Sequence, residues 1–182
     1  MFFGVPEADD LIGSDPKGGQ IVEISGPSQC GKTYLALKAC AQKELPLWID
    51  LDGTFPYVYA KKLDLVDKII IFNQFDQIVT AVSQLLDSTH PDIIIVDPTH
   101  AIDIRKRMEL YRLLFFHAPR LNIPVILVSS GTDQNRVSSM AAIRIEMAPV
   151  RYKGNKVIYL MRTIKNINAP AWKEASFAKD IE

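Results

Sequence analysis

The stretch that most constrains the fold is residues 21–33, IVEISGPSQCGKT, where a short apolar run of strand character leads into Gly-x-x-x-x-Gly-Lys-Thr and then a helical pattern. Gly26 and Gly31 bracket a tight turn without side chains, so successive backbone N–H groups can point at phosphate oxygens. Lys32 can then reach the outer phosphates as a point charge, and the Thr33 hydroxyl can ligate Mg²⁺. The order strand, loop, helix is the context that a phosphate-binding loop requires. The predicted nucleotide-binding residues are Gly26, Pro27, Ser28, Gln29, Cys30, Gly31, Lys32 and Thr33.

Composition limits the class of protein. A chain of 182 residues that is 48% hydrophobic can bury one substantial core, so we expect a single domain over residues 1–182. The formal net charge is +0, which favours neither a strongly basic nucleic-acid binder nor an acidic tail. Two cysteines are too few for a disulfide framework, and we find no apolar run of about 18 residues that would span a membrane. These features predict a soluble protein of a reducing, intracellular compartment.

Strand and helix patterns alternate along most of the chain. Residues 2–19 predict a lead-in with one or two helical turns. Further buried strands are predicted over residues 47–51, 68–72, 92–96 and 124–129, with helices over 34–41, 55–65, 78–86 and 105–121. This order predicts an α/β fold, a mostly parallel twisted sheet flanked by helices. Residues 143–147, 156–163 and 173–177 predict short strands around a hairpin turn at residues 153–155, which indicates an antiparallel C-terminal extension.

Carboxylates follow two of the predicted strands. Asp97 ends the strand over residues 92–96, at the edge where α/β sheets bind ligands, and we expect it to hold Mg²⁺ together with Thr33. The alternative is that Asp97 only caps the turn before Pro98. Asp50 and Asp52 end the strand over residues 47–51, and one of them could orient a water for hydrolysis of the terminal phosphate while the other satisfies the turn.

With these three features in place, the chain resembles the RecA/RadA recombinase superfamily, in particular the ATPase core of its archaeal and eukaryotic branch. The blocks that carry the resemblance are residues 4–13 (GVPEADDLIG), 21–33, 48–55 (WIDLDGTF), 93–102 (IIIVDPTHAI), 124–131 (PVILVSSG), 141–147 (AAIRIEM) and 174–182 (EASFAKDIE). The resemblance implies a RecA-like P-loop core that binds ATP and Mg²⁺. It places the catalytic Glu of the family on Asp52, which is one methylene shorter, so slow hydrolysis is expected.

Other departures from the family pattern indicate a trimmed member. Ser130 and Gly131 stand where a working recombinase has the Asn-Gln that senses the terminal phosphate, and the loop that follows is cut to about residues 131–140. The pattern of an N-terminal helical DNA-binding domain is not found, nor is the linker with its Phe-x-x-Ala. Residues 115–118 match those letters, but they lie on a predicted helix and are expected in the core. Strand exchange and a homofilament are therefore not expected.

The resemblance implies an ATP-binding recombinase paralogue that assists a recombinase in homologous recombination and DNA repair, within a heteromeric complex. It implies the nucleus for a eukaryotic source and the cytoplasm for an archaeal one. Two rivals stay open. One is a KaiC-like regulatory P-loop ATPase unrelated to recombination, which would turn over ATP without DNA or recombinase. The other is a structural adaptor with a vestigial P-loop, which would keep its partner binding after Lys32→Ala.

Two groups of basic residues in the sequence could contact DNA. Arg105, Lys106 and Arg107 form a basic triplet where the first DNA-binding loop of the family would lie. A second basic group in the C-terminal extension comprises Arg151, Lys153, Lys156, Arg162 and Lys165. Either group could neutralise phosphates in weak, salt-sensitive and non-specific binding. The alternative is a solvated surface, because Lys and Arg are mostly exposed in any protein. The three histidines are too scattered to indicate a metal site.

Overall fold

The computed structural model describes residues 1–73, 77–130 and 140–180. Its centre is one eight-stranded sheet in the order β3-β2-β4-β5-β1-β6-β7-β8. The strands are β1 (Ile21–Gly26), β2 (Pro46–Asp50), β3 (Ile70–Phe72), β4 (Ile93–Asp97), β5 (Val125–Ser130), β6 (Ile143–Lys153), β7 (Lys156–Asn166) and β8 (Glu174–Asp180). The first six in chain order pair in parallel, and β7 and β8 pair antiparallel, so the predicted α/β class and the sheet extension are confirmed.

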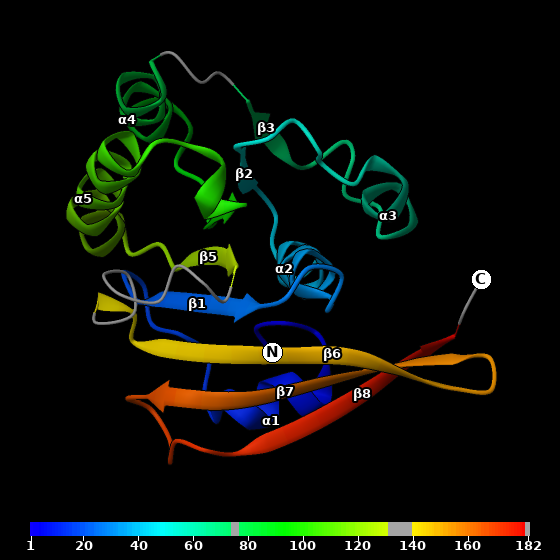
Figure 1. Cartoon of the computed structure of the whole chain (residues 1–182). Helices are drawn as coiled ribbons and strands as arrows, with labels where there is room; N and C mark the ends of the chain where they lie inside the picture. Colours follow the sequence, from blue (N-terminus) through cyan, green and yellow to red (C-terminus); the bar gives the residue numbers. More distant parts are fainter. Residues whose placement is uncertain (74–76, 131–139, 181–182) are drawn as a thin grey trace.

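Helices cover both faces of the sheet, as the buried apolar strands require. They are α1 (Pro6–Ile12), α2 (Lys32–Cys40), α3 (Tyr57–Lys62), α4 (Ile78–Thr89) and α5 (Ile104–Leu121), with a short 3-10 turn η1 (Thr99–Ala101). Figure 1 shows α4 and α5 on one side of the parallel strands and α2 and α3 on the other. Successive side chains of a strand point to opposite faces, so Val22 and Ile24 of β1 pack in the core under α1 and α2, whereas Ile21 packs in the core under α4 and α5.

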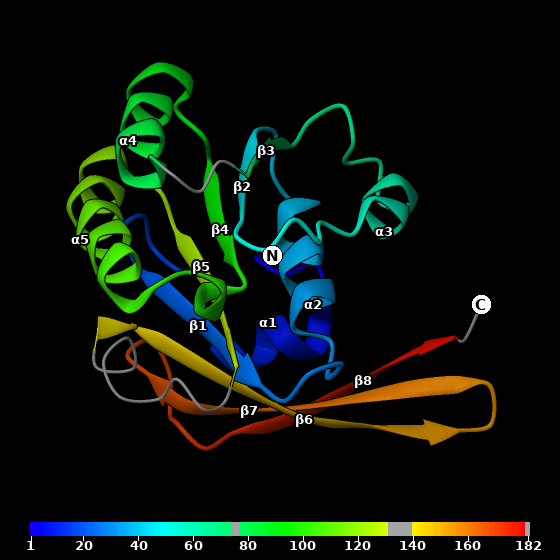
Figure 2. The same cartoon turned by 45° about the horizontal axis from the view of Figure 1, so that its top comes forward.

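The extension differs from the prediction in the pairing and in the length of its strands. Its first strand, β6, pairs in parallel with β1, with Ile24 opposite Ile145, and only then turns back into β7. Two parallel strands cannot be joined by a tight turn, so the pairing of β6 with β1 is not visible in a local strand pattern. The strands are also longer than predicted. Together β6 and β7 form a hairpin that extends beyond the parallel strands, with its turn at Gly154, where φ is +60° (Figures 1 and 2).

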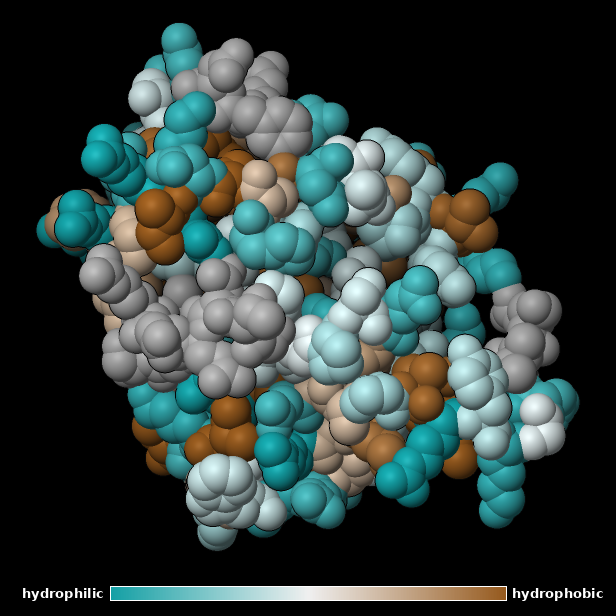
Figure 3. All heavy atoms as spheres, in the orientation of Figure 1, coloured by the Kyte–Doolittle hydropathy of each residue, from teal (hydrophilic) through white to brown (hydrophobic). Residues whose placement is uncertain are grey.

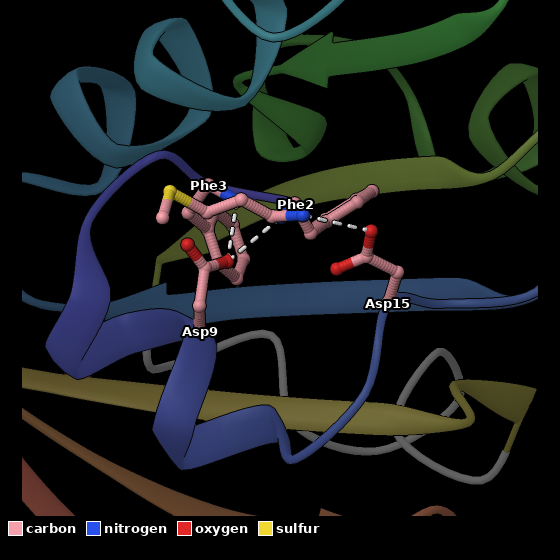
Figure 4. Close-up of polar contacts among 5 residues, drawn as sticks. Phe2, Phe3, Asp9 and Asp15 are labelled. Atoms are coloured by element: carbon pink, nitrogen blue, oxygen red, sulfur yellow. Dashed lines mark hydrogen bonds and ion pairs between the residues drawn. The ribbon is translucent and has the colours of Figure 1, made fainter.

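The N-terminal lead-in folds back onto the sheet. Phe2 and Phe3 are 1% and 0% exposed, and α1 packs against β7 and β8. The carboxylate of Asp9 accepts hydrogen bonds from the backbone N–H groups of Phe2 (2.9 Å) and Phe3 (2.7 Å), as Figure 4 shows. The Met1 ammonium lies 3.1 Å from Asp15, in an exposed ion pair. Asp9 therefore fixes the segment that closes this side of the core.

A buried polar group links three strands of the sheet. Glu23 of β1 is 1% exposed, accepts a hydrogen bond from the Ser129 hydroxyl of β5 (3.0 Å), and pairs with Arg144 of β6 (2.7 Å). These contacts satisfy a charge that would otherwise be costly in the interior. On the face seen in Figure 3, hydrophobic residues occur as small separate patches among hydrophilic ones. No helix in the described ranges is long and apolar enough to cross a membrane.

Candidate functional site

The loop between β1 and α2 has the backbone that its glycines predict. Gly31 lies in the left-handed region with φ +94°, directly before α2. A Cβ atom at Gly31 would lie 2.4 Å from the Tyr159 ring, and one at Gly26 would lie 2.4 Å from the Met147 carbonyl oxygen. Both positions therefore require glycine for space as well as for conformation. Pro27, Ser28 and Gln29 are exposed at the tip, with the backbone of Gln29 at φ +62°.

The Lys32 side chain folds over the loop between β1 and α2. Its Nζ donates hydrogen bonds to the carbonyl oxygens of Gly26 (2.9 Å) and Pro27 (2.6 Å) and lies 3.7 Å from Cys30 Sγ. Burial raises the pKa of the Cys30 thiol, against the opposing effect of Lys32. Cys30 is therefore a neutral packing residue under the loop. The Lys32 ammonium, in contrast, sits over the turn that the motif assigns to the phosphates.

Thr33 and Asp97 meet at the carboxyl edge of the sheet. The Thr33 Oγ1 donates a hydrogen bond of 2.8 Å to Oδ2 of Asp97, which ends β4 and is 8% exposed. Burial raises the pKa of Asp97 to about 6, the Thr33 hydrogen bond lowers it, and the nearby Asp52 raises it further. A hydroxyl and a carboxylate together are oxygen donors that suit Mg²⁺, which takes its remaining ligands from water and phosphates. The two residues brought together fit the predicted Mg²⁺ site. A group of three or more His, Cys, Asp or Glu at metal spacing is not found in the described chain.

Asp50 and Asp52 have different surroundings. The Asp50 carboxylate, 3% exposed, accepts hydrogen bonds from the backbone N–H groups of Gly53 (3.0 Å), Thr54 (3.2 Å) and Phe55 (3.1 Å). Burial raises its pKa despite these bonds. Asp52 is exposed and accepts hydrogen bonds from the backbone and hydroxyl of Thr54. Asp50 thus organises the turn after β2, and α3 begins two residues later than predicted. Asp52 is the carboxylate that is open to solvent.

A pocket of about 330 Å³ adjoins the loop, and its aromatic wall was not anticipated from the sequence. Its lining residues are Gln29, Gly31, Lys32, Thr33, Tyr34, Tyr59 and Tyr159. The Tyr34 ring stacks on that of Tyr159 at 5.9 Å and meets Tyr59 edge to face at 6.2 Å. These tyrosines come from α2, α3 and β7, so no local pattern in the sequence joins them. Phosphate-binding groups and flat rings therefore line one cavity.

The residues of the two predicted basic groups differ in their exposure. Arg105 and Lys106 are exposed at the start of α5, but Arg107 is only 9% exposed on the inner face of the helix. The prediction of a three-residue surface is therefore wrong for Arg107, because the helical period turns it away from its two neighbours. In the extension, Arg162 is paired with Glu146. Arg151, Lys153 and Lys156 are exposed on the hairpin, and Lys165 is half-buried.

Two further predictions can be placed. Residues 115–118 lie within α5, with Phe115 half-buried and Ala118 buried in the core, as expected. Gly131 and the loop that follows it, residues 131–139, lie outside the described residues. Ser130, which ends β5, lies within them.

Comparisons with known proteins agree with this geometry. The RecA N-terminal domain matches residues 7–110, more than half of the chain. Protein RecA of Wolbachia pipientis subsp. Culex pipiens (strain wPip) is 33% identical over 91% of the chain and 59% of its own length. Protein RecA of Thermotoga neapolitana is 36% identical over 54% of the chain and 30% of its own length. The chain thus spans less than two thirds of these curated relatives.

A solved structure gives the same fold. The crystal structure of the RadB recombinase superposes with a TM-score of 0.77 over 100% of both chains, at 19% sequence identity. At this identity the likeness establishes the arrangement of strands and helices, and the residues of the site must be argued from their own geometry.

Proposed function

The chain belongs to the RecA/RadA recombinase superfamily, and on this premise we propose that it is an ATP-binding recombinase paralogue with one RecA-like core domain over residues 1–182. In this proposal it assists a recombinase in homologous recombination and DNA repair, within a heteromeric complex. It performs no strand exchange of its own and hydrolyses ATP weakly or not at all. Its compartment follows its source, the nucleus in a eukaryote and the cytoplasm in an archaeon.

The observation that carries nucleotide binding is the contact of Thr33 with Asp97 beside the phosphate-binding loop. When ATP binds, the loop N–H groups and Lys32 would hold its phosphates, exchanging the Gly26 and Pro27 carbonyls for phosphate oxygens. Thr33 and Asp97 would hold Mg²⁺, which would neutralise the phosphate charge. The pocket walled by tyrosines lies next to these groups and offers rings on which a base can stack.

Weak hydrolysis is supported by the surroundings of Asp52. A carboxylate that activates water must reach the water beside the terminal phosphate. Asp52 is a short side chain, and its Oδ1 already accepts two hydrogen bonds from Thr54. A partner protein would then respond to the binding of ATP rather than to its hydrolysis.

Calorimetry of Mg-ATP binding tests the proposal, with and without a cognate recombinase. Lys32→Ala and Asp97→Ala should each weaken binding by about tenfold or more, because each removes a charged contact. Lys38→Ala, on the same helix but away from the loop, is the matched control. Nucleotide should also strengthen association with the recombinase. Absence of binding in both settings would favour the adaptor, and rapid turnover without recombinase or DNA would favour a free-standing ATPase.

We also propose a weak, non-specific contact of Arg105 and Lys106 with DNA. Both are exposed on the first turn of α5. Each phosphate contact that is lost should reduce the magnitude of the slope of log K against log salt by about 0.7 on single-stranded DNA. Fluorescence anisotropy with single-stranded DNA at several salt concentrations measures this slope. A slope unchanged by the double substitution to Ala would show that these residues only form a solvated surface.

A further inference from the structure

The last strand forms an open edge of the sheet. The strand order ends at β3 on one side and at β8 on the other, and in the described chain no strand pairs with the outer side of β8. β3 has 3 residues, whereas β8 has 7. Figure 1 shows β8 as the outermost strand, beyond β7. An edge strand of this length presents a row of backbone N–H and C=O groups with which another strand can pair.

The register shows which groups of β8 face the open edge. The backbone N–H of Thr163 donates a hydrogen bond of 2.9 Å to the carbonyl oxygen of Lys173, so these residues form a hydrogen-bonded pair. Opposite residues of an antiparallel ladder alternate between bonded and non-bonded pairs, and the ladder of β7 with β8 has no register shift. The N–H and C=O groups of Glu174, Ser176 and Ala178 therefore point away from β7. Within the described residues they have no hydrogen-bond partner.

An acidic groove lies between α1 and the start of β8. Its volume is about 410 Å³, and its apolar lining residues are Leu11 and Ala175. Its polar lining residues are Glu7, Asp10, Lys173, Glu174 and Ser176. The three carboxylates are exposed, make no ion pair in the part of the chain that the structure describes, and outnumber the one ammonium. The groove beside the open edge therefore favours basic side chains.

Trp172 enters β8 in an unusual backbone conformation. Its N–H donates to the carbonyl oxygen of Thr163 (2.6 Å), and the N–H of Thr163 donates to Lys173, so two residues oppose one in a β-bulge. The left-handed first position of such a bulge is usually glycine, but Trp172 takes it with φ +66°. The side chain is nevertheless 69% exposed. A strained backbone that holds a large ring in solvent, directly before Lys173 of the groove, is typical of a contact site.

We propose that the edge of β8 and the acidic groove bind an extended basic segment of a partner protein, which adds a strand to the sheet. Hydrogen bonds to the backbone of Glu174, Ser176 and Ala178 hold the added strand. Its successive side chains point to opposite faces, so a Lys or Arg at every second position lies on the α1 side, beside Glu7 and Asp10.

The charges of β8 argue against a second copy of this chain as the occupant. Antiparallel pairing of two whole β8 strands would place Glu174 of each copy opposite an acidic residue of the other, and like charges directly opposite are destabilising. A basic segment meets the opposite charge at the same place. The inference goes beyond the proposed function, because this surface needs no nucleotide.

Fluorescence anisotropy tests the proposal with a labelled peptide in which lysine and threonine alternate over about seven residues, the length of β8. We expect saturable binding at low salt. The double variant Glu7→Gln with Asp10→Asn should weaken it by about fivefold or more, because two carboxylates are lost without a change of shape. Asp67→Asn removes an exposed carboxylate outside the groove and should change Kd by less than about twofold. Trp172→Ala should weaken binding by about threefold or more.

Three control peptides separate strand addition from charge attraction. The same peptide N-methylated at every residue keeps its charges but has no backbone donors, and it should not bind. A peptide of the same composition with its lysines consecutive should bind at least about fivefold more weakly. A glutamate–threonine peptide should not bind. Equal binding of any of these three and the alternating lysine peptide would overturn the proposal.

Two further measurements identify the occupant and isolate this surface from the nucleotide site. Self-association of the free chain that the lysine peptide disrupts would assign the edge to a second copy and overturn the proposal; sedimentation of the chain with and without peptide shows which holds. Lys32→Ala should leave peptide binding unchanged. Loss of peptide binding in that variant would tie the surface to the phosphate-binding loop and contradict its independence, whereas failure of ATP binding alone contradicts only the nucleotide site.

Discussion

The Thr33 hydroxyl donates a 2.8 Å hydrogen bond to the Asp97 carboxylate, across the gap between α2 and β4. Thr33 and Asp97 are far apart in the chain. Thr33 lies in the first turn of α2, after β1 and the loop, and Asp97 is the last residue of β4 in the same sheet. Because the carboxyl ends of parallel strands meet at one edge, the phosphate-binding loop and the acidic residue converge there. The same burial that brings them together also raises the pKa of Asp97 to about 6.

The raised pKa of Asp97 predicts that Asp97→Asn stabilises the nucleotide-free protein at pH 7. The pKa is 3.8 in the reference state and about 6 in the folded protein, so folding takes up a proton between these values. The free energy of unfolding therefore falls as pH rises from about 4 to 6. The Asn variant avoids this loss and should be more stable at pH 7 by on the order of 2 kcal/mol.

Urea denaturation at pH 4 and pH 7, without nucleotide, measures this effect. The wild type should lose stability between the two values relative to the variant, and the difference should shrink at pH 4. Addition of Mg-ATP should stabilise the wild type and leave the variant nearly unchanged. A variant that is less stable than the wild type at pH 7 would contradict the assignment.

Gly31→Ala should destabilise the fold by about 3 kcal/mol. The left-handed backbone at φ +94° costs an Ala residue about 1 kcal/mol, and its Cβ would meet the Tyr159 ring at 2.4 Å, which adds overpacking strain. Gly154→Ala is the matched control, because φ is +60° there but no atom lies within 4 Å of the added Cβ. We expect about 1 kcal/mol for the control by thermal or urea unfolding. Equal effects at both sites would show that the contact with Tyr159 has no energetic role.

Asp9→Ala should cost about 2–3 kcal/mol, because it leaves the N–H groups of Phe2 and Phe3 without their acceptor in a buried segment. Asp15→Ala removes only the exposed pair with the Met1 ammonium, and should cost less than about 1 kcal/mol. Chemical denaturation of the two variants side by side gives the comparison. If they were equally stable, the lead-in would contribute nothing specific to the core.

Asp52→Glu should increase ATP turnover. The added methylene extends the carboxylate toward the water beside the terminal phosphate, and general-base catalysis contributes at least about a hundredfold when the base is well placed. An increase of about tenfold allows for incomplete alignment and for the contact with Thr54. Phosphate release under saturating Mg-ATP is the measurement, with Asp52→Asn as the control. Turnover that is the same in the Glu, Asp and Asn forms would exclude this position from the chemistry.

Much of the fold could be predicted because its signals are local. The apolar runs, the Pro and Gly breaks and the period of residues 78–86 are each readable within a short window. The predicted helices and strands agree with the structure to within a few residues for most of the parallel half. The prediction of the C-terminal extension is less accurate, because a local strand pattern does not show that β6 pairs in parallel with β1.

The candidate site likewise has a part that can be predicted from adjacent residues and a part that depends on the folded chain. The loop from Gly26 to Thr33 was predicted because its chemistry depends on residues that are adjacent in the chain. The sequence does not separate the roles of Asp50 and Asp52, because only the folded turn at Gly53 determines which carboxylate accepts the backbone N–H groups. Arg107 was misplaced because three basic residues in a row look alike in sequence, and only the helix determines which one faces inward.

The α/β class, the Gly-x-x-x-x-Gly-Lys-Thr loop and the candidate acidic residue Asp97 are all predictable from the sequence, since each depends on residue type and local spacing. The tertiary structure alone decided that Tyr34, Tyr59 and Tyr159 form one wall and that Lys179 lies against it. These side chains come from four elements and meet only through sheet order and strand register. Contacts of this kind are set by the packing of distant segments, and no short window of sequence contains them.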